Sequence, residues 1–128
     1  PDLSAETDHA RARQLVRDAE AASRRGARDD ATKLFNQALA ADPRSDAALI
    51  GLSDLAFDDS DYSAAVDYAE KAVKLAPARG DYRVRLGDAY FKVMNFAQAQ
   101  RAYEAAAERG DPRAAERLAK LRSKLGAP

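Results

Sequence analysis

Small and hydrophobic residues recur along this chain at helical intervals, in short segments separated by polar turns. The clearest segment covers residues 61–77, in which Ala65, Ala69 and Ala72 fall on one face of a helix. Pro77 ends that helix, because proline lacks an N–H group and its ring clashes with the preceding turn. The pattern therefore predicts a helix with a face of small residues, against which a second helix can pack closely.

This pattern occurs three times with a period of 34 residues, so that Phe35, Ala69 and Tyr103 occupy equivalent positions. Alanines flank each of these residues at helical spacing. Such a period is typical of helix–turn–helix arrays, in which each helix pair buries its hydrophobic face against the next pair. The sequence thus predicts an all-α array of repeats.

Start and stop signals divide the chain into seven expected helices. Ser4 or Thr7 can cap the start of the first helix, and Ser45 can cap the start of the third. The first helix ends before Gly26, which is expected in the C′ position. Residues before Ser4 are expected to be a frayed lead-in. The first helix is expected to run from its cap at Ser4 or Thr7 to about Arg24, and the other six are expected at about residues 28–40, 46–57, 61–76, 81–93, 96–109 and 112–125.

The last two helices have their own start signals. Asn95 and Gln98 have the spacing of a capping box. Asp111 and Pro112 predict the start of the seventh helix, as N-cap and first helical residue. A single apolar stripe on that helix predicts a terminal cap, and we favour solvent over acidic lipid or nucleic acid as the environment of its basic residues. The stripe consists of Ala114, Leu118, Leu121 and Leu125.

The overall charge argues against two classes of partner. The 128 residues include 21 basic and 21 acidic side chains, so the net charge is zero, which disfavours nucleic acid or an anionic membrane surface. No apolar run is long enough for a transmembrane helix, so no membrane insertion is expected.

The chain begins at Pro1, and we interpret it as one domain, residues 1–128, cut from a longer protein. The compartment stays open, with the cytoplasm slightly favoured, and abundant Arg and Ala hint at a bacterial source.

The residue types disfavour an enzyme and a cofactor site. The chain contains one histidine, His9, and no cysteine, so it offers no candidate pair of nucleophile and base. We interpret His9 as a surface residue. Asp58, Asp59 and Asp61 form an acidic turn but lack the glycine and the distant glutamate of a calcium loop. We therefore expect no catalytic residues, no metal and no other cofactor.

The repeated residues resemble the tetratricopeptide repeat. The third copy is most similar in its first helix, with Leu86, Gly87 and Tyr90. The first copy matches the second-helix pattern of alanine, aromatic, alanine and proline, and departures from the family pattern occur at Asp18, Ala69 and Arg83. The matching residues of the first copy are Ala31, Phe35, Ala38 and Pro43. The resemblance implies a right-handed α-solenoid of three repeats, at about residues 12–45, 46–79 and 80–111, followed by a capping helix at 112–125.

The resemblance also implies a function. In this family the first helices of the repeats line a concave groove that binds a peptide segment or partner helix, so we expect a protein–protein interaction module that acts as a scaffold or adaptor. The alternative is a structural spacer or homodimerisation domain of a larger protein. The groove positions of the family correspond here to Arg13, Val16, Arg17, Glu20, Arg24, Ala47, Ile50, Asp54, Phe57, Asp58, Asp81, Val84, Arg85, Asp88, Phe91 and Lys92.

Equivalent groove positions form an apolar row and, one turn further along each helix, an acidic row. An amphipathic partner with apolar anchors and at least one basic residue would fit such a surface. In the alternative interpretation, these residues only support neighbouring turns and keep the face soluble. The apolar row is Val16, Ile50 and Val84, and the acidic row is Glu20, Asp54 and Asp88.

One branch of the family binds the C-terminal carboxylate of heat-shock chaperones with lysine, asparagine and arginine. The equivalent positions here hold Val16, Glu20, Gly51, Asp81 and Arg85, of which only Arg85 agrees. Since Glu20 and Asp81 would repel a carboxylate, we expect no binding of a chaperone tail.

The first helix bears on the oligomeric state. Leu3, Leu15 and Val16 lie on its side that precedes the first repeat, and they could pack against a second copy. Family arrays of three repeats are usually monomeric when both ends are capped, and the C-terminal cap is the obvious one here. A monomer is favoured over a dimer.

Overall fold

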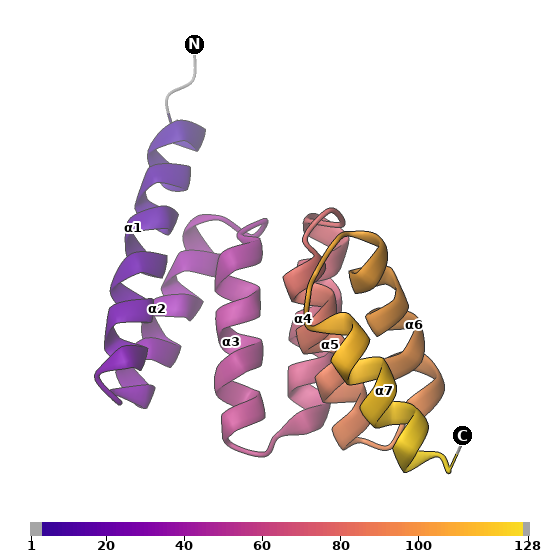
Figure 1. The fold of residues 1–128 in the computed structure, drawn as a ribbon. Helices are drawn as coiled ribbons and strands as arrows, with labels where there is room; N and C mark the ends of the chain where they lie inside the picture. The colour runs from indigo at the N-terminus through magenta and orange to yellow at the C-terminus, as the bar shows by residue number, and fades with distance from the viewer. Residues whose placement is uncertain (1–3, 127–128) are drawn as a thin grey trace.

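The computed structural model describes residues 4–126, in which seven α-helices and no strands form a right-handed solenoid. The ends of the chain lie at opposite ends of the array, and α1 extends beyond the other helices (Figure 1). The expected lead-in at residues 1–3 lies outside the described residues. The helices are α1 Ser4–Arg24, α2 Arg28–Ala41, α3 Asp46–Asp58, α4 Tyr62–Leu75, α5 Gly80–Lys92, α6 Phe96–Glu108 and α7 Ala114–Lys124.

The turn within each helix pair repeats one geometry. Gly26, Ser60 and Met94, each 34 residues after the last, have positive φ angles of 80°, 64° and 64°. In each case the following N–H group donates to a carbonyl five residues earlier, as in Ala27 N to Ala22 O at 2.9 Å. This is the Schellman arrangement, in which a left-handed residue satisfies the last carbonyls of a helix. The expected C′ role of Gly26 is confirmed, and the same position is occupied in the other two pairs without glycine.

Three helix starts use the side-chain caps that the sequence suggests. The oxygens of Ser45, Asp61 and Asn95 accept hydrogen bonds from N–H groups three residues later, at 3.2, 3.3 and 3.4 Å. Only half of the expected capping box forms at Asn95, however. The Asn95 N–H group donates to Tyr90 O and not to the side chain of Gln98. The expected cap at Ser4 or Thr7 is wrong, since α1 already includes both residues.

The seventh helix begins later than predicted. Asp111 and Pro112 were expected to be its N-cap and first residue, but α7 starts at Ala114. A tight turn comes first, in which the Ala114 N–H group donates to Asp111 O at 3.3 Å. The Asp111 carboxylate accepts from the Arg113 N–H group at 2.9 Å, so the residue stabilises the turn before the helix and not the helix itself.

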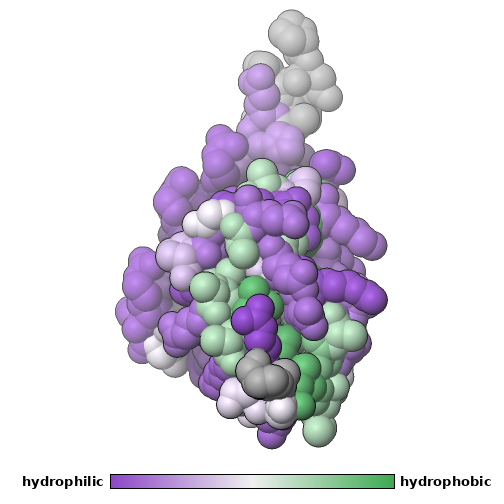
Figure 2. Space-filling view, turned by 45° about the vertical axis from the view of Figure 1, so that its right-hand side comes forward, coloured by the Kyte–Doolittle hydropathy of each residue, from purple (hydrophilic) through white to green (hydrophobic). Residues whose placement is uncertain are grey.

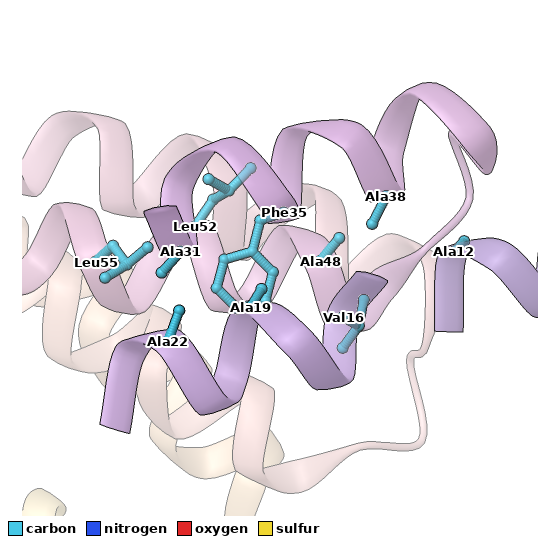
Figure 3. Packing of buried hydrophobic residues seen from close by; sticks show 10 residues of the cluster. All are labelled: Ala12, Val16, Ala19, Ala22, Ala31, Phe35, Ala38, Ala48, Leu52 and Leu55. Atoms are coloured by element: carbon cyan, nitrogen blue, oxygen red, sulfur yellow. The ribbon is translucent and has the colours of Figure 1, made fainter. Parts of the chain in front are cut away.

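Alanines, branched aliphatic side chains and a few aromatic rings make up the core. Figure 3 shows the ring of Phe35 reaching from α2 toward Ala19 of α1, among other alanines. Ala19, Ala31 and Ala38 are fully buried, and Phe35 is 3% exposed. Alanine at these positions lets the helices approach closely, and the aromatic ring fills the space between them.

Two glycines make room for aromatic rings. A Cβ atom on Gly51 would lie 2.3 Å from Cζ of Phe35, and a Cβ atom on Gly87 would lie 2.5 Å from Cε1 of Tyr103. Both distances are far shorter than a van der Waals contact. The glycines in α3 and α5 therefore allow these rings to lie directly on the helix backbone.

Helix α7 covers the end of the array with two buried residues, Ala114 and Leu121. Leu125 was expected on the same buried stripe, but it is 52% exposed, because it follows the last residue of the helix. Val93 and Met94, in the turn before α6, are exposed as well. Figure 2 shows hydrophobic atoms gathered on the side of the molecule near the C-terminus, with hydrophilic atoms around them.

Candidate functional site

The groove is lined by helices α1, α3, α5 and α7. Four adjoining clefts follow this face of the array, with volumes of about 420, 370, 200 and 310 Å³ from the α1 end to the α7 end. Ala47 lines the first two clefts, Asp54 and Arg85 line the second and third, and Phe57 and Asp88 line the third and fourth. Most of the predicted groove positions are thus brought together along one face, whereas Asp58 and Val84 line none of these four clefts.

The expected apolar row is largely covered. Val84 has no exposed surface, while Val16 and Ile50 are 7% and 8% exposed. Val16 packs in the cluster between α1, α2 and α3, and Val84 packs with Tyr103 and Ala106 of α6. Val84 therefore cannot serve as an anchor for a ligand, whereas Val16 and Ile50 present only a small area to the first and second clefts.

The acidic row is mostly paired within the molecule. Asp54 of α3 accepts from Nε of Arg85 on α5 at 3.0 Å. Asp88 accepts from Nε of Arg117 on α7 at 2.9 Å and from the hydroxyl of Tyr103 at 2.5 Å. Among residues 6–126, the third member of the row, Glu20, has no such partner. The row is therefore not a free anionic stripe, and Glu20 alone offers an unpaired carboxylate.

A network of charges fills the centre of the groove. Asp81 accepts from Nη2 of Arg79 at 2.7 Å and from Nη1 of Arg85 at 3.4 Å. The hydrogen bond from Arg79 lowers the pKa of Asp81, whereas burial raises the pKa of Asp54 although Arg85 acts in the opposite direction. Alternating charges of this kind leave the centre of the groove without net charge.

The C-terminal half of the groove contains the aromatic surface. Phe57 packs edge-to-face on Tyr62, with ring centroids 5.2 Å apart, and Phe91 packs in the same way on Phe96 at 5.4 Å. Both phenylalanines are half-buried, so each offers part of its ring to the clefts. Nζ of Lys92 lies 5.6 Å from the centroid of Tyr62. These rings are held in place before any ligand binds.

The remaining predicted positions are exposed charged residues, of which Arg13, Arg17 and Arg24 line the first two clefts. Arg13, Arg17 and Arg24 are exposed on α1, and Arg17 donates to Gln14 at 2.7 Å. Asp58 is exposed at the end of α3 and faces Arg28 of α2 at 3.8 Å, so it is directed away from the groove.

Sequence reasoning missed the contribution of α7. Arg113, Arg117 and Lys120 line the last two clefts, although the sequence pattern assigned the basic residues of this helix to solvent. The periodicity could have revealed them, because a helix that packs against the third repeat occupies the position of the next groove-lining helix. Tyr82 was also missed: it lines the second cleft, and its hydroxyl donates at 2.7 Å to Asp46, which lines the first cleft.

The described residues contain no cluster that suits a metal ion. No group of three or more His, Asp or Glu side chains between residues 6 and 126 is arranged to hold one. In the acidic turn, Asp59 pairs with Arg28 at 2.6 Å and Asp61 caps α4. His9 is half exposed and its Nδ1 lies 2.7 Å from Asp42. No helix of the described chain has the length and apolar character needed to cross a membrane.

Comparison with known proteins agrees with this architecture. The first TPR (tetratricopeptide repeat) domain of Spaghetti (RPAP3), bound to the HSP90 peptide SRMEEVD, has a TM-score of 0.87 at 21% identity, over 93% of this chain and 96% of that chain. The Sgt2 TPR domain from Aspergillus fumigatus has a TM-score of 0.83 at 24% identity, over 90% and 79%. MamA has a TM-score of 0.84 at 21% identity, over 97% and 72%. These similarities concern the fold.

The family assignment comes from the sequence. No curated protein sequence matches the chain. The family model described as tetratricopeptide repeat matches residues 16–80 and 84–126, which is most of the chain. Domains of this family are typically protein–protein interaction modules and are generally not catalytic. The protein described here belongs to the tetratricopeptide-repeat family.

Proposed function

We propose that the concave groove binds a peptide segment or a helix of a partner protein, so that the domain acts as a scaffold or adaptor. The observation that carries this proposal is the row of four clefts along α1, α3, α5 and α7. Their walls combine rings fixed in advance, such as Phe57 and Phe91, with exposed charges such as Glu20 and Lys92. Preformed apolar surface lowers the entropic cost of binding, and the charges set orientation and rate.

The partner is expected to be amphipathic, with side chains that contact Phe57 and Phe91. A basic side chain of the partner is expected only near Glu20, because Arg85 and Arg117 already neutralise Asp54 and Asp88. Each exposed charge pair would contribute only about 0.2–1 kcal/mol. Apolar contacts would therefore determine most of the affinity.

The test is a capture experiment with a charge-exchanged groove. The double variant Glu20→Lys/Lys92→Glu leaves the net charge unchanged and alters two exposed residues, so the fold should be retained. A matched control is Glu104→Lys/Lys33→Glu, which makes the same exchange at exposed positions of α6 and α2. A partner captured by the native domain and by the control, but lost from the groove variant, supports the proposal. Equal capture by all three would contradict it.

We also propose that the groove does not bind chaperone tails through their terminal carboxylate. Gly51 offers no side chain to a carboxylate, Val16 is buried, and Asp81 is paired with Arg79. The test uses the peptide SRMEEVD, the ligand of the similar RPAP3 domain, with a free or an amidated C-terminus. Equal affinities for the two forms are expected, and an affinity that depends on the free carboxylate and on Arg85 would contradict this prediction.

A further inference from the structure

The last cleft of the groove differs from the other three in its charge. It has a volume of about 310 Å³ and lies where α3, α5, α6 and α7 meet. Its charged lining consists of three cations and one carboxylate, a net charge of +2 in a chain whose total charge is zero. The cations are Lys92, Arg117 and Lys120, and the carboxylate is Asp88.

The single carboxylate is already occupied. Asp88 accepts hydrogen bonds from Arg117 and Tyr103, so it has little capacity left for a third group. Asp58 and Asp59, which follow Phe57 in the sequence, are directed toward Arg28 of α2 at 3.8 and 2.6 Å. Acidic residues near the cleft therefore do not compensate its excess of positive charge.

Two of the cations have no acidic partner within the described chain. Lys92 and Lys120 are exposed, and neither forms an ion pair with any residue of the described chain from residue 6 onward. They come from different helices, α5 and α7, and both line a cleft whose apolar wall consists of Phe57 and Phe91. The cleft thus presents an aromatic surface that carries lysines from two helices.

We infer that this end of the groove binds a partner segment in which acidic side chains flank an apolar one. The acidic side chains would pair with Lys92 and Lys120, and the apolar side chain would pack on Phe57 and Phe91. This inference rests on the proposed function, since it names the chemistry of the partner at one end of the same groove. It also gives the capping helix a role in recognition.

Side-chain carboxylates fit the cleft better than the single carboxylate at the end of a chain. Lys92 and Lys120 belong to two helices, so one terminal carboxylate would leave a lysine without an acidic partner, whereas a segment with several acidic residues can pair with both. The groove also continues from this cleft toward α1, because Asp88 and Phe57 line the adjoining cleft as well. A segment that passes through the cleft can therefore continue along the face.

The experiment is a titration of the ¹⁵N-labelled domain with a peptide capped at both ends, acetyl-GSEEFEEG-amide. Its uncharged counterpart is acetyl-GSQQFQQG-amide. Amide shifts are expected in the second half of α5 and along α7, with an affinity for the acidic peptide about fivefold or more above that for the uncharged one. The affinity should fall as salt is added, because exposed charges are screened.

Two double variants test whether the affinity for the acidic peptide depends on Lys92 and Lys120. Lys92→Gln/Lys120→Gln should lower the affinity for the acidic peptide about fivefold or more, and Lys33→Gln/Lys74→Gln, the same charge change at exposed positions of α2 and α4, should leave it unchanged. Arg117 is not substituted, since its loss would leave Asp88 unpaired.

Three results would overturn the inference. Absence of shifts with either peptide would reject an acidic segment as the ligand. Shifts confined to α1 and the first half of α3 would reject this cleft while leaving groove binding in place. Equal affinity for the acidic and uncharged peptides would reject the role of the lysines. The proposed function itself is judged separately, by whether the charge-exchanged groove loses its captured partner.

Discussion

Single residues at the turns determine part of the stability of each repeat. Ser60 and Met94 occupy the left-handed position that Gly26 occupies in the first pair. For a residue other than glycine this conformation costs about 1–2 kcal/mol. The side chain of Met94 is 71% exposed, so its packing contacts do little to offset this cost.

We predict that Met94→Gly stabilises the domain by roughly 0.5–1 kcal/mol, because glycine adopts positive φ without strain while losing more entropy on folding. Urea denaturation measures the change. Val93→Gly is the matched control: Val93 is the preceding residue, with φ at −88°, and its substitution should destabilise. A Met94→Gly protein less stable than the native one would contradict the prediction.

The contact between Gly87 and Tyr103 is another feature at this scale. Gly87→Ala should destabilise the domain by about 1–2 kcal/mol, since displacement of a packed ring outweighs the gain of about 1 kcal/mol in helix propensity. The double variant with Tyr103→Leu should recover most of the loss, and denaturation of all four proteins measures the coupling. Additive effects of the two substitutions would show that the ring contact is not the cause.

At the scale of elements, the turn before α7 holds the cap in place. The Asp111 carboxylate accepts from the Arg113 backbone at 2.9 Å and from its guanidinium Nη2 at 3.0 Å. These hydrogen bonds lower the pKa of Asp111 below its ordinary value of 3.8. A group of this kind stabilises the fold above the pKa of the unfolded chain, and the stability is lost as the pH falls through the folded pKa.

We therefore predict that Asp111→Asn costs about 1 kcal/mol at pH 7. The cost should shrink as the pH falls below 3.8, where the carboxylate of the unfolded chain takes up a proton, and should vanish below the lower pKa of the folded carboxylate. Urea denaturation at pH 7 and at about pH 2 provides the comparison. Glu104→Gln, on the exposed face of α6, is the control and should show no such dependence. A cost that stays constant over this range would mean that the charge of Asp111 does not matter.

Helix positions were predictable from the sequence, because the 34-residue period and the alanine spacing can be read along the chain without knowing which helices pack together. The partners of Asp54 and Asp88 were not, since Arg85 and Arg117 lie 31 and 29 residues away and meet them only once the helices are stacked. The burial of Val84 was missed for a related reason. Its position on a groove helix is clear from the pattern, but its cover by α6 depends on the angle between the helices.

At the scale of the whole molecule, the large hydrophobic side chains that are exposed lie toward one end. The large hydrophobic side chains exposed in the described chain, Val93, Met94 and Leu125, lie near the C-terminal end of the array. At the other end Val16 is buried and Leu15 is half-buried, and Leu3 lies outside the described residues. The surface available there for a second copy is therefore smaller than the sequence pattern indicates.

We predict that the domain sediments as a monomer of 13.9 kDa at all accessible concentrations. Specific dimers generally bury about 1,200–2,000 Å² in total, which scattered single side chains do not provide. Sedimentation velocity at two concentrations about a hundredfold apart tests this prediction. A mass that rises with concentration would contradict it, and Leu125→Glu would then show whether the exposed end is responsible.

The position of α7 has a consequence for how such a chain could grow. This helix stands where the first helix of a fourth repeat would stand, and it lines the groove beside α5. A complete 34-residue unit inserted between α6 and the turn at Asp111 would lengthen the groove and move the cationic end outward by one repeat. Duplication could thus change the length of the segment that is recognised while the residues at its far end stay the same.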